Sequence, residues 1–183
     1  MCIICHNKYT KDTTKIVCCI NVDSIPDTLV NLVYLYCCGT IVTELPNTLI
    51  NLVTLYCYWT KIATLPDTLI NLVTLGCSET LITEIPDTLV NLVTLYCGYN
   101  LITKIPNTLV KLDTLYCRKT LITELPSTLR NIKQIYSLNK PFIILYKYKF
   151  NEIEIDFSSR YKKLIVLFNV LLLDVYRHYR YYF

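Results

Sequence analysis

The sequence predicts a β-rich α/β solenoid, wound as a right-handed horseshoe with short parallel strands on its concave face. A 20-residue phrase recurs with little drift, and leucine opens it at residues 32, 52, 72, 92 and 112. We number each phrase from that leucine as position 1, and apolar residues return at positions 4, 11, 14 and 18. Because so short a unit cannot bury its apolar face alone, successive units must stack.

The chain divides into three parts. Residues 1–15 are expected to cap the N-terminal end, since a solenoid exposes a raw apolar surface at each end. Residues 16–140 form the solenoid: a degenerate copy from residue 16, five full copies over 32–131 and a half copy after them. Residues 141–183 are expected to cap the other end.

The N-terminal segment has the one cluster of residues suited to a metal. Its candidate ligands are Cys2, Cys5, His6, Cys18 and Cys19. Four soft ligands suit Zn²⁺, and metal binding would stabilise a short cap. The alternative is that these thiols have no ligand, because no second Cys-x-x-Cys pair follows and Cys18 falls on a core position. The sequence favours this alternative, so we expect the protein to bind no cofactor.

Each coil follows from its pattern. Positions 3 to 7 alternate outward and inward residues, which indicates a short strand with positions 4 and 6 in the core and positions 3, 5 and 7 on the concave face. Proline at position 15 ends the extended segment. Twenty residues leave no room for a long helix, so the convex side is expected to be a 3₁₀ turn or an extended segment.

Residues 92–109 give the clearest copy, LVTLYCGYNLITKIPNTL. This frame resembles the leucine-rich repeat, and the near-identical copies with cysteine at position 6 are similar to leucine-rich repeat proteins of large DNA viruses of amoebae. The resemblance implies a protein-binding scaffold, whose partner would be a host protein if the viral likeness holds. Position 9 departs from the family, because its usual asparagine is present only as Asn100 and threonine replaces it elsewhere.

The last 43 residues predict two cap elements. Residues 142–157 read as a hairpin that turns at Asn151-Glu152, with one apolar face and one face of matched charges. A helix is expected over about residues 161–179. Its apolar stretch from Leu164 to Val175 is too short for a membrane span of about 20 residues, so membrane insertion is not expected.

Composition narrows the function. The formal net charge is only +4 with acids and bases interspersed, so nucleic acid is not an expected partner. The ten cysteines include five at position 6, which predicts a column of buried thiols and a reducing, cytoplasmic compartment. The two histidines are at opposite ends and no catalytic constellation is evident, so we do not expect an enzyme.

The concave face is the predicted binding site. Tyrosine recurs at position 5, broken only by Gly76, and positions 7 and 8 differ in every copy. The candidate partner-binding residues are Tyr34, Tyr36, Tyr56, Tyr58, Trp59, Glu79, Tyr96, Tyr99, Tyr116 and Arg118. Tyr and Trp are enriched at binding hot spots. The tyrosines have an alternative interpretation, in which their stacking only stiffens the sheet. The variation at positions 7 and 8 could equally reflect drift without selection.

Three functions are compatible with these observations. The first is a scaffold that binds a partner protein on the concave face. The second is an adaptor whose N-terminal Cys/His segment binds zinc and recruits further machinery, for example of the ubiquitin pathway. The third is a structural repeat array without a specific partner. The oligomeric state does not follow from the sequence.

Overall fold

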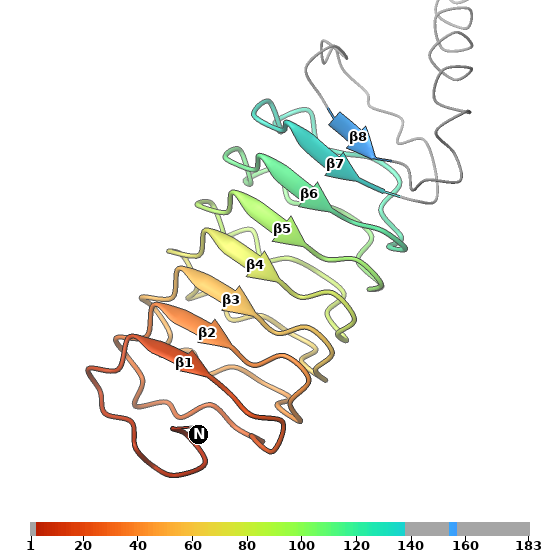
Figure 1. Cartoon of the computed structure of the whole chain (residues 1–183). Coiled ribbons are helices and arrows are strands. Elements are labelled where there is room, and N and C mark those ends of the chain that lie inside the picture. Colours follow the sequence, from red (N-terminus) through yellow and green to blue (C-terminus); the bar gives the residue numbers. More distant parts are fainter. Residues whose placement is uncertain (1–2, 138–153, 157–183) are drawn as a thin grey trace, which may run out of the picture.

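The computed structural model describes residues 3–137 and 154–156, which form one parallel sheet in sequence order (Figure 1). Its strands are β1 (Lys15–Val17), β2 (Tyr34–Tyr36), β3 (Thr54–Tyr56), β4 (Thr74–Gly76), β5 (Thr94–Tyr96), β6 (Thr114–Tyr116), β7 (Gln134–Tyr136) and β8 (Glu154–Asp156). From β2 onward each residue pairs with the one 20 positions later, as Leu35 does with Leu55. The predicted stack of equivalent coils is confirmed.

The core contains the same positions of every coil. Leucines at positions 1, 4 and 18 and the aliphatic residues at position 11 are buried in one continuous cluster with the position-6 thiols. Each fully buried leucine side chain contributes about 1.5–3 kcal/mol relative to its exposed state. Since the cluster runs unbroken through the stack, each coil depends on its neighbours for burial.

At position 9, the threonine and asparagine side chains form hydrogen bonds to different coils. The threonine hydroxyls donate to the position-6 carbonyl of their own coil, as Thr60 Oγ1 does to Cys57 at 2.8 Å. Asn100 instead reaches the preceding coil, where Nδ2 donates to the Cys77 carbonyl at 2.8 Å and Oδ1 accepts from the Thr80 amide at 2.9 Å. Threonine is too short for this second bond, so at position 9 only Asn100 ties two described coils together.

The convex side consists of single turns. The Leu89 amide donates to the Pro86 carbonyl at 3.3 Å, and the Leu92 amide donates to the Leu89 carbonyl at 3.0 Å. These bonds have 3₁₀ spacing, but they do not extend into a helix, and the described residues contain none. The pattern predicted a 3₁₀ turn or an extended segment; single turns form, and in the described residues they do not build a 3₁₀ segment.

A second asparagine ladder, which the sequence analysis missed, occupies position 20. Asn51 Nδ2 donates to the Val30 carbonyl of the preceding coil at 2.9 Å, and Asn71, Asn91 and Asn131 make the same bond. These bonds tie consecutive convex turns together. They supply the contact between coils that the threonines at position 9 do not make.

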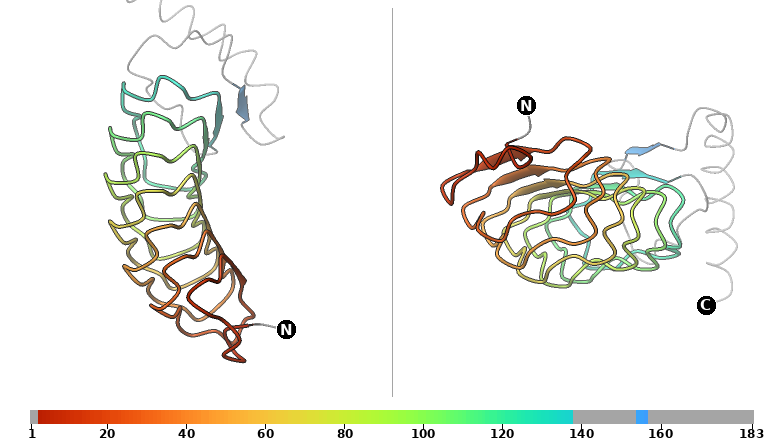
Figure 2. Two further views of the ribbon diagram at one scale, coloured as in Figure 1. Left: turned by 90° about the vertical axis from the view of Figure 1, so that its left-hand side faces the viewer. Right: turned by 90° about the horizontal axis from the view of Figure 1, so that it is seen from below.

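The stack bends gently, and the sheet lies along the inner side of the bend (Figure 2). The alternate residues of the strands that point away from the core therefore face a concave surface. At the N-terminal end, Ile3, Ile4 and Tyr9 pack against the core cluster. In the described part of the chain, no helix has the length and apolarity to cross a membrane.

The C-terminal end shows one element that the sequence analysis placed differently. β8, which falls within the predicted hairpin, pairs parallel with β7, and Ile155 stands opposite Ile135. The spacing is again 20 residues, so the coil register continues one strand further than the repeat pattern indicated. The predicted antiparallel partner of this strand and the helix over 161–179 lie outside the described residues.

Candidate functional site

Rows of side chains run along the concave face, because equivalent residues of parallel strands stand in register. Tyrosines of positions 3, 5 and 7 form one chain of ring contacts, the aromatic column: Tyr34, Tyr36, Tyr56, Tyr58, Tyr96, Tyr116 and Tyr136. All of these residues are partly exposed. The predicted outward orientation of the tyrosines is thus observed.

The C-terminal half of the column is a regular stack. The Tyr96 and Tyr116 rings lie 4.5 Å apart with an interplanar angle of 26°. The Tyr116 and Tyr136 rings lie 4.0 Å apart and nearly parallel, at 4°. Each ring here covers the face of its neighbour, so little aromatic face remains for a partner.

The N-terminal half is a tilted cluster. Tyr34 contacts Tyr56 at 6.1 Å with an angle of 64°, and Tyr36 contacts the same ring at 6.3 Å and 55°. Tyr58 lies 5.8 Å from Tyr56. Rings in such edge-on and tilted arrangements attract one another through their quadrupoles while part of each face stays open.

The sequence analysis expected Gly76 to break the column, but the chain of ring contacts continues past this residue. Tyr58 from the preceding coil leans into the space beside this glycine and contacts both Tyr56 and Tyr96, at 5.8 Å and 6.4 Å. A Cβ atom at residue 76 would stand 2.6 Å from Tyr56 Cδ1 and closer still to the end of Tyr58. The glycine therefore makes room for the ring that bridges the two halves.

Burial of the bridging phenol has an electrostatic consequence. It raises the pKa of Tyr58 well above the usual 10.0, and it raises the pKa of Tyr56 as well. The pKa of Tyr36 is raised chiefly by its hydrogen bond with Cys38. These phenols therefore stay neutral to higher pH than free tyrosine.

Position 8 has an unusual backbone in every full copy. Gly39, Trp59, Glu79, Tyr99 and Lys119, which we call the position-8 row, have φ angles of 67°, 55°, 57°, 58° and 52°. This left-handed conformation suits glycine and costs another residue roughly 1–2 kcal/mol. A bulky aromatic residue in it is a genuine outlier. Two of these positions carry exposed aromatic side chains, Trp59 and Tyr99.

The row is held in register by the backbone. The Trp59 amide donates to the Ser78 carbonyl at 3.3 Å, the Glu79 amide to Gly98 at 3.0 Å and the Tyr99 amide to Arg118 at 2.7 Å. Side chains of adjacent coils therefore start about 4.8 Å apart. Trp59 is 62% exposed and Tyr99 is 42% exposed.

Lysine and arginine side chains of the chain itself lie over aromatic rings near both ends of the concave face. Lys15 Nζ is 4.8 Å from the centre of the Tyr34 ring. At the other end, Arg118 Cζ is 5.6 Å and Lys119 Nζ 5.2 Å from the centre of the Tyr99 ring. The described residues place no such cation over Trp59, whose ring instead contacts Tyr58 at 6.1 Å.

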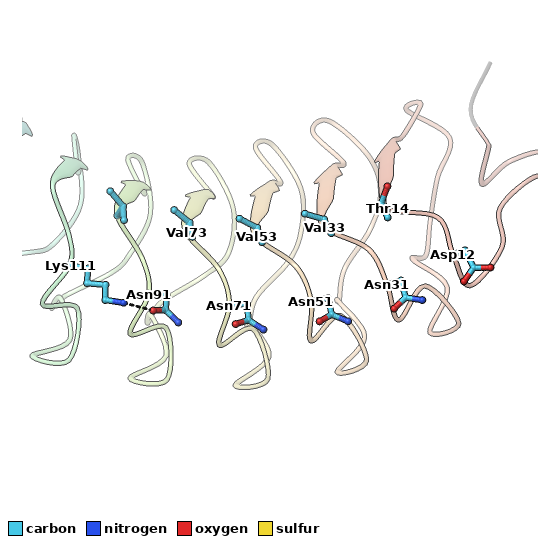
Figure 3. A pocket seen from close by; sticks show the side chains of 11 residues that line it. Asp12, Thr14, Asn31, Val33, Asn51, Val53, Asn71, Val73, Asn91 and Lys111 are labelled. Atoms are coloured by element: carbon cyan, nitrogen blue, oxygen red, sulfur yellow. Dashed lines mark hydrogen bonds between the residues drawn. The ribbon is translucent and has the colours of Figure 1, made fainter.

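A groove of about 860 Å³ runs along the flank of the sheet where the strands begin (Figure 3). Asparagines of position 20 and valines of position 2 line it, with Asp12 and Lys111 near its ends. Figure 3 shows Lys111 directed at Asn91, and their Nζ and Oδ1 atoms lie 2.7 Å apart. Since Asn51, Asn71 and Asn91 already donate to the backbone, the groove is mainly a product of the repeat.

Position 10 forms a second exposed row of apolar side chains. Ile41, Leu81, Leu101 and Leu121 are each more than half exposed, and Lys61 interrupts the row in the third strand's coil. These residues are aliphatic and lack the aromatic groups of the concave face. They provide a matched comparison for experiments on the aromatic column.

The predicted metal ligands are only partly brought together. The Cys5 and Cys19 sulfur atoms lie 3.1 Å apart, whereas Cys18 is buried in the core. Cys2 lies outside the described residues, and within the described ones no group of three His, Cys, Asp or Glu side chains could hold a metal ion. Because Cys18 belongs to the core, the described residues do not fit a four-ligand zinc site.

The thiol column inside the solenoid is present as expected. Cys37, Cys57, Cys77, Cys97 and Cys117 are buried with at most 1% exposure. Burial raises the pKa of all five thiols, that of Cys117 to about 12. A thiol that stays protonated is a poor nucleophile, so these groups act as small apolar side chains.

Nine of the ten candidate residues fall into two groups joined by contacts, and Glu79 is the tenth. Ring contacts join Trp59 to six of the tyrosines: Tyr34, Tyr36, Tyr56, Tyr58, Tyr96 and Tyr116. Tyr99 and Arg118 contact each other, and Glu79 stands between Trp59 and Tyr99 in the position-8 row. The left-handed backbone was missed, because asparagine or glycine normally marks it and only Gly39 is of that type.

No protein-family model and no curated protein matches the sequence. Solved structures do match. A leucine-rich repeat protein of Leptospira interrogans aligns with a TM-score of 0.57 at 20% identity over 80% of this chain and 49% of its own. The internalin InlF of Listeria monocytogenes gives 0.63 at 19% identity over 81% and 49%. This chain has the leucine-rich repeat fold.

A further internalin of Listeria monocytogenes, InlP, aligns with a TM-score of 0.53 at 26% identity over 69% of this chain and 40% of that one. The chain thus spans less than half the length of these leucine-rich repeat proteins. Such likeness establishes the architecture and is consistent with an interaction scaffold. It does not identify a partner.

Proposed function

We propose that the protein is a non-enzymatic leucine-rich repeat scaffold that binds a partner protein through the concave aromatic surface. The main observation behind this proposal is the pair of exposed aromatic side chains on left-handed backbone, Trp59 and Tyr99. The tilted tyrosine cluster adjoins Trp59 through Tyr58.

Two physical arguments support a binding role. Tyr and Trp provide large rigid contact areas with few rotatable bonds, which is why they dominate interface hot spots. A row whose backbone favours glycine would be more stable with glycine, so its aromatic residues have a cost that binding would offset.

The compartment and the origin of the partner belong to the same proposal. Five buried thiols suit a reducing, intracellular environment. If the likeness to viral repeat proteins holds, the partner is a host protein. The right-handed winding and the C-terminal helix over 161–179 remain predictions.

Affinity capture from the native cell tests the proposal. The variant Tyr58→Ser/Trp59→Ser/Tyr99→Ser should lose its specific partner, while Leu81→Ser/Leu101→Ser/Leu121→Ser should retain it. The control removes three exposed apolar side chains from position 10. Loss of the partner only in the control would place the interface elsewhere, and a wild-type protein without specific partners would indicate a structural array.

A zinc-binding adaptor is the second candidate. The Cys5 and Cys19 sulfurs lie 3.1 Å apart, and a complete site would need further ligands such as Cys2, which lies outside the described residues. Metal analysis of the purified full chain decides: stoichiometric zinc that is lost in Cys5→Ser/Cys19→Ser would support this function, and absence of zinc would reject it.

A further inference from the structure

The position-8 row places two aromatic side chains on either side of a carboxylate. Trp59 and Tyr99 are two coils apart, and Glu79 occupies the coil between them. Hydrogen bonds between adjacent coils hold all three backbones at strand spacing, about 4.8 Å per coil. The two aromatic side chains therefore start about 10 Å apart, and the Glu79 backbone stands midway between them.

Tyr99 shows what such a ring does in this row. Lys119, its neighbour one coil further along, places Nζ 5.2 Å from the ring centre, and Arg118 lies at 5.6 Å. These distances are typical of cation–π contacts, which lie within about 6 Å. The chain thus occupies a ring of this row with its own cations.

Trp59 has the opposite neighbour. The next residue of the row is Glu79, an anion, and on the N-terminal side Gly39 leaves open space where a side chain would stand. Among the described residues, neither an ion pair to Glu79 nor a cation over Trp59 is found. Indole is the best cation acceptor of the aromatic side chains, and this one is 62% exposed.

We propose that Trp59 and Glu79 bind an arginine side chain of the partner protein. The planar guanidinium would stack on the indole and donate two hydrogen bonds to the carboxylate, a combination that the point charge of lysine cannot match. The Lys119 backbone stands three coils from Trp59, about 14 Å away, and its ammonium group lies over the Tyr99 ring. This inference rests on the proposed function and specifies the partner's chemistry.

Trp59 is the single tryptophan of the chain, so its emission reports on this site alone. The full-length protein is titrated with acetyl-Gly-Arg-Gly-amide and with the peptide in which neutral citrulline replaces arginine. The arginine peptide should change the emission saturably and bind about tenfold more tightly than citrulline, a difference of about 1.4 kcal/mol. Equal binding of the two peptides would overturn the proposal.

Two further comparisons test the geometry. Glu79→Gln should weaken the arginine peptide about tenfold, whereas Glu84→Gln, a change at an exposed carboxylate of the same coil, should not. A lysine peptide should bind more weakly than the arginine peptide, and equal affinity would contradict guanidinium stacking. If the arginine peptide leaves Trp59 emission unchanged while Tyr58→Ser still abolishes partner capture, this inference fails and the proposed function stands.

Discussion

The two halves of the aromatic column differ although equivalent strands of one sheet build both. Rings of the C-terminal half stack face to face, with centres 4.0–4.5 Å apart, whereas those of the N-terminal half meet tilted or edge-on at 5.8–6.3 Å. Stacked rings cover one another's faces. Tilted rings leave faces open, which is why the proposed binding surface is the tilted cluster, whereas the stack stiffens the sheet.

Sequence differences at two positions explain the change. Gly76 removes a ring from position 5 of one coil, and Tyr58 adds a ring at position 7 of the coil before it. Tyr58 fills the space and is followed directly by Trp59. A substitution that looks like a defect in the repeat therefore creates the boundary between the halves.

The largest expected effect comes from filling the space beside Gly76 that Tyr58 occupies. Gly76→Ala should reduce the free energy of unfolding by about 1–3 kcal/mol, because its Cβ displaces Tyr58 and Tyr56. In a Tyr58→Ser background the same change should cost less, giving a coupling above about 0.5 kcal/mol. Denaturant titration of the four proteins measures this, and additive effects would show that Tyr58 does not occupy the space.

Removal of single rings should separate the halves by stability. Tyr116→Ala should cost about 2 kcal/mol in free energy of unfolding, because Tyr116 stacks on both Tyr96 and Tyr136. Tyr36→Ala should cost less than about 1 kcal/mol, since its ring makes one tilted contact with Tyr56. Equal losses in denaturant unfolding would mean that the stack is no stiffer than the cluster.

The position-8 row should reverse the usual order of stability between alanine and glycine variants. Trp59→Gly should be more stable than Trp59→Ala by about 1 kcal/mol, because glycine accepts a φ of 55° without strain. At Thr94, within β5, alanine should be more stable than glycine. Thermal unfolding of the four variants tests this. A more stable alanine variant at residue 59 would argue against strain there.

The smallest effect concerns pH. Folding raises the pKa of Tyr58, so its contribution to stability is full below pH 10 and is lost as pH rises through the folded pKa. The buried thiols act in the same direction, so the free energy of unfolding should fall above pH 9. Tyr58→Phe should reduce the slope above pH 10 by less than about 1 kcal/mol per pH unit, since Tyr58 is partly exposed. An unchanged slope would mean that Tyr58 is fully solvated.

The repeat pattern was sufficient to predict the scaffold. A leucine that returns every 20 residues fixes which side chains point inward, and stacking then fixes the strand register. The thiol column and the outward tyrosines follow directly from that register. Even β8 keeps the phase, since Ile155 stands 20 residues after Ile135, but the surrounding residues depart from the repeat and concealed it.

Features that depend on contacts between coils were harder to predict. Tyr58 belongs to one coil and fills the space of the next, so a position-by-position comparison treats Gly76 as a gap. The left-handed backbone at position 8 arises from the turn out of the strand, and Trp59, Glu79 and Tyr99 are residue types that do not indicate it. For the metal ligands, the repeat pattern had already placed Cys18 on a core position, and Cys18 is buried there.

The most direct test of the central claim measures how exposed Trp59 is in the complex. With 5-fluorotryptophan at this single site, the fluorine signal is followed with and without the captured partner while a soluble paramagnetic agent broadens exposed groups. Because Trp59 is 62% exposed in the free protein, binding at the tilted cluster should reduce the broadening several-fold. Broadening that is equal in the free and bound states would contradict the assignment of the binding surface.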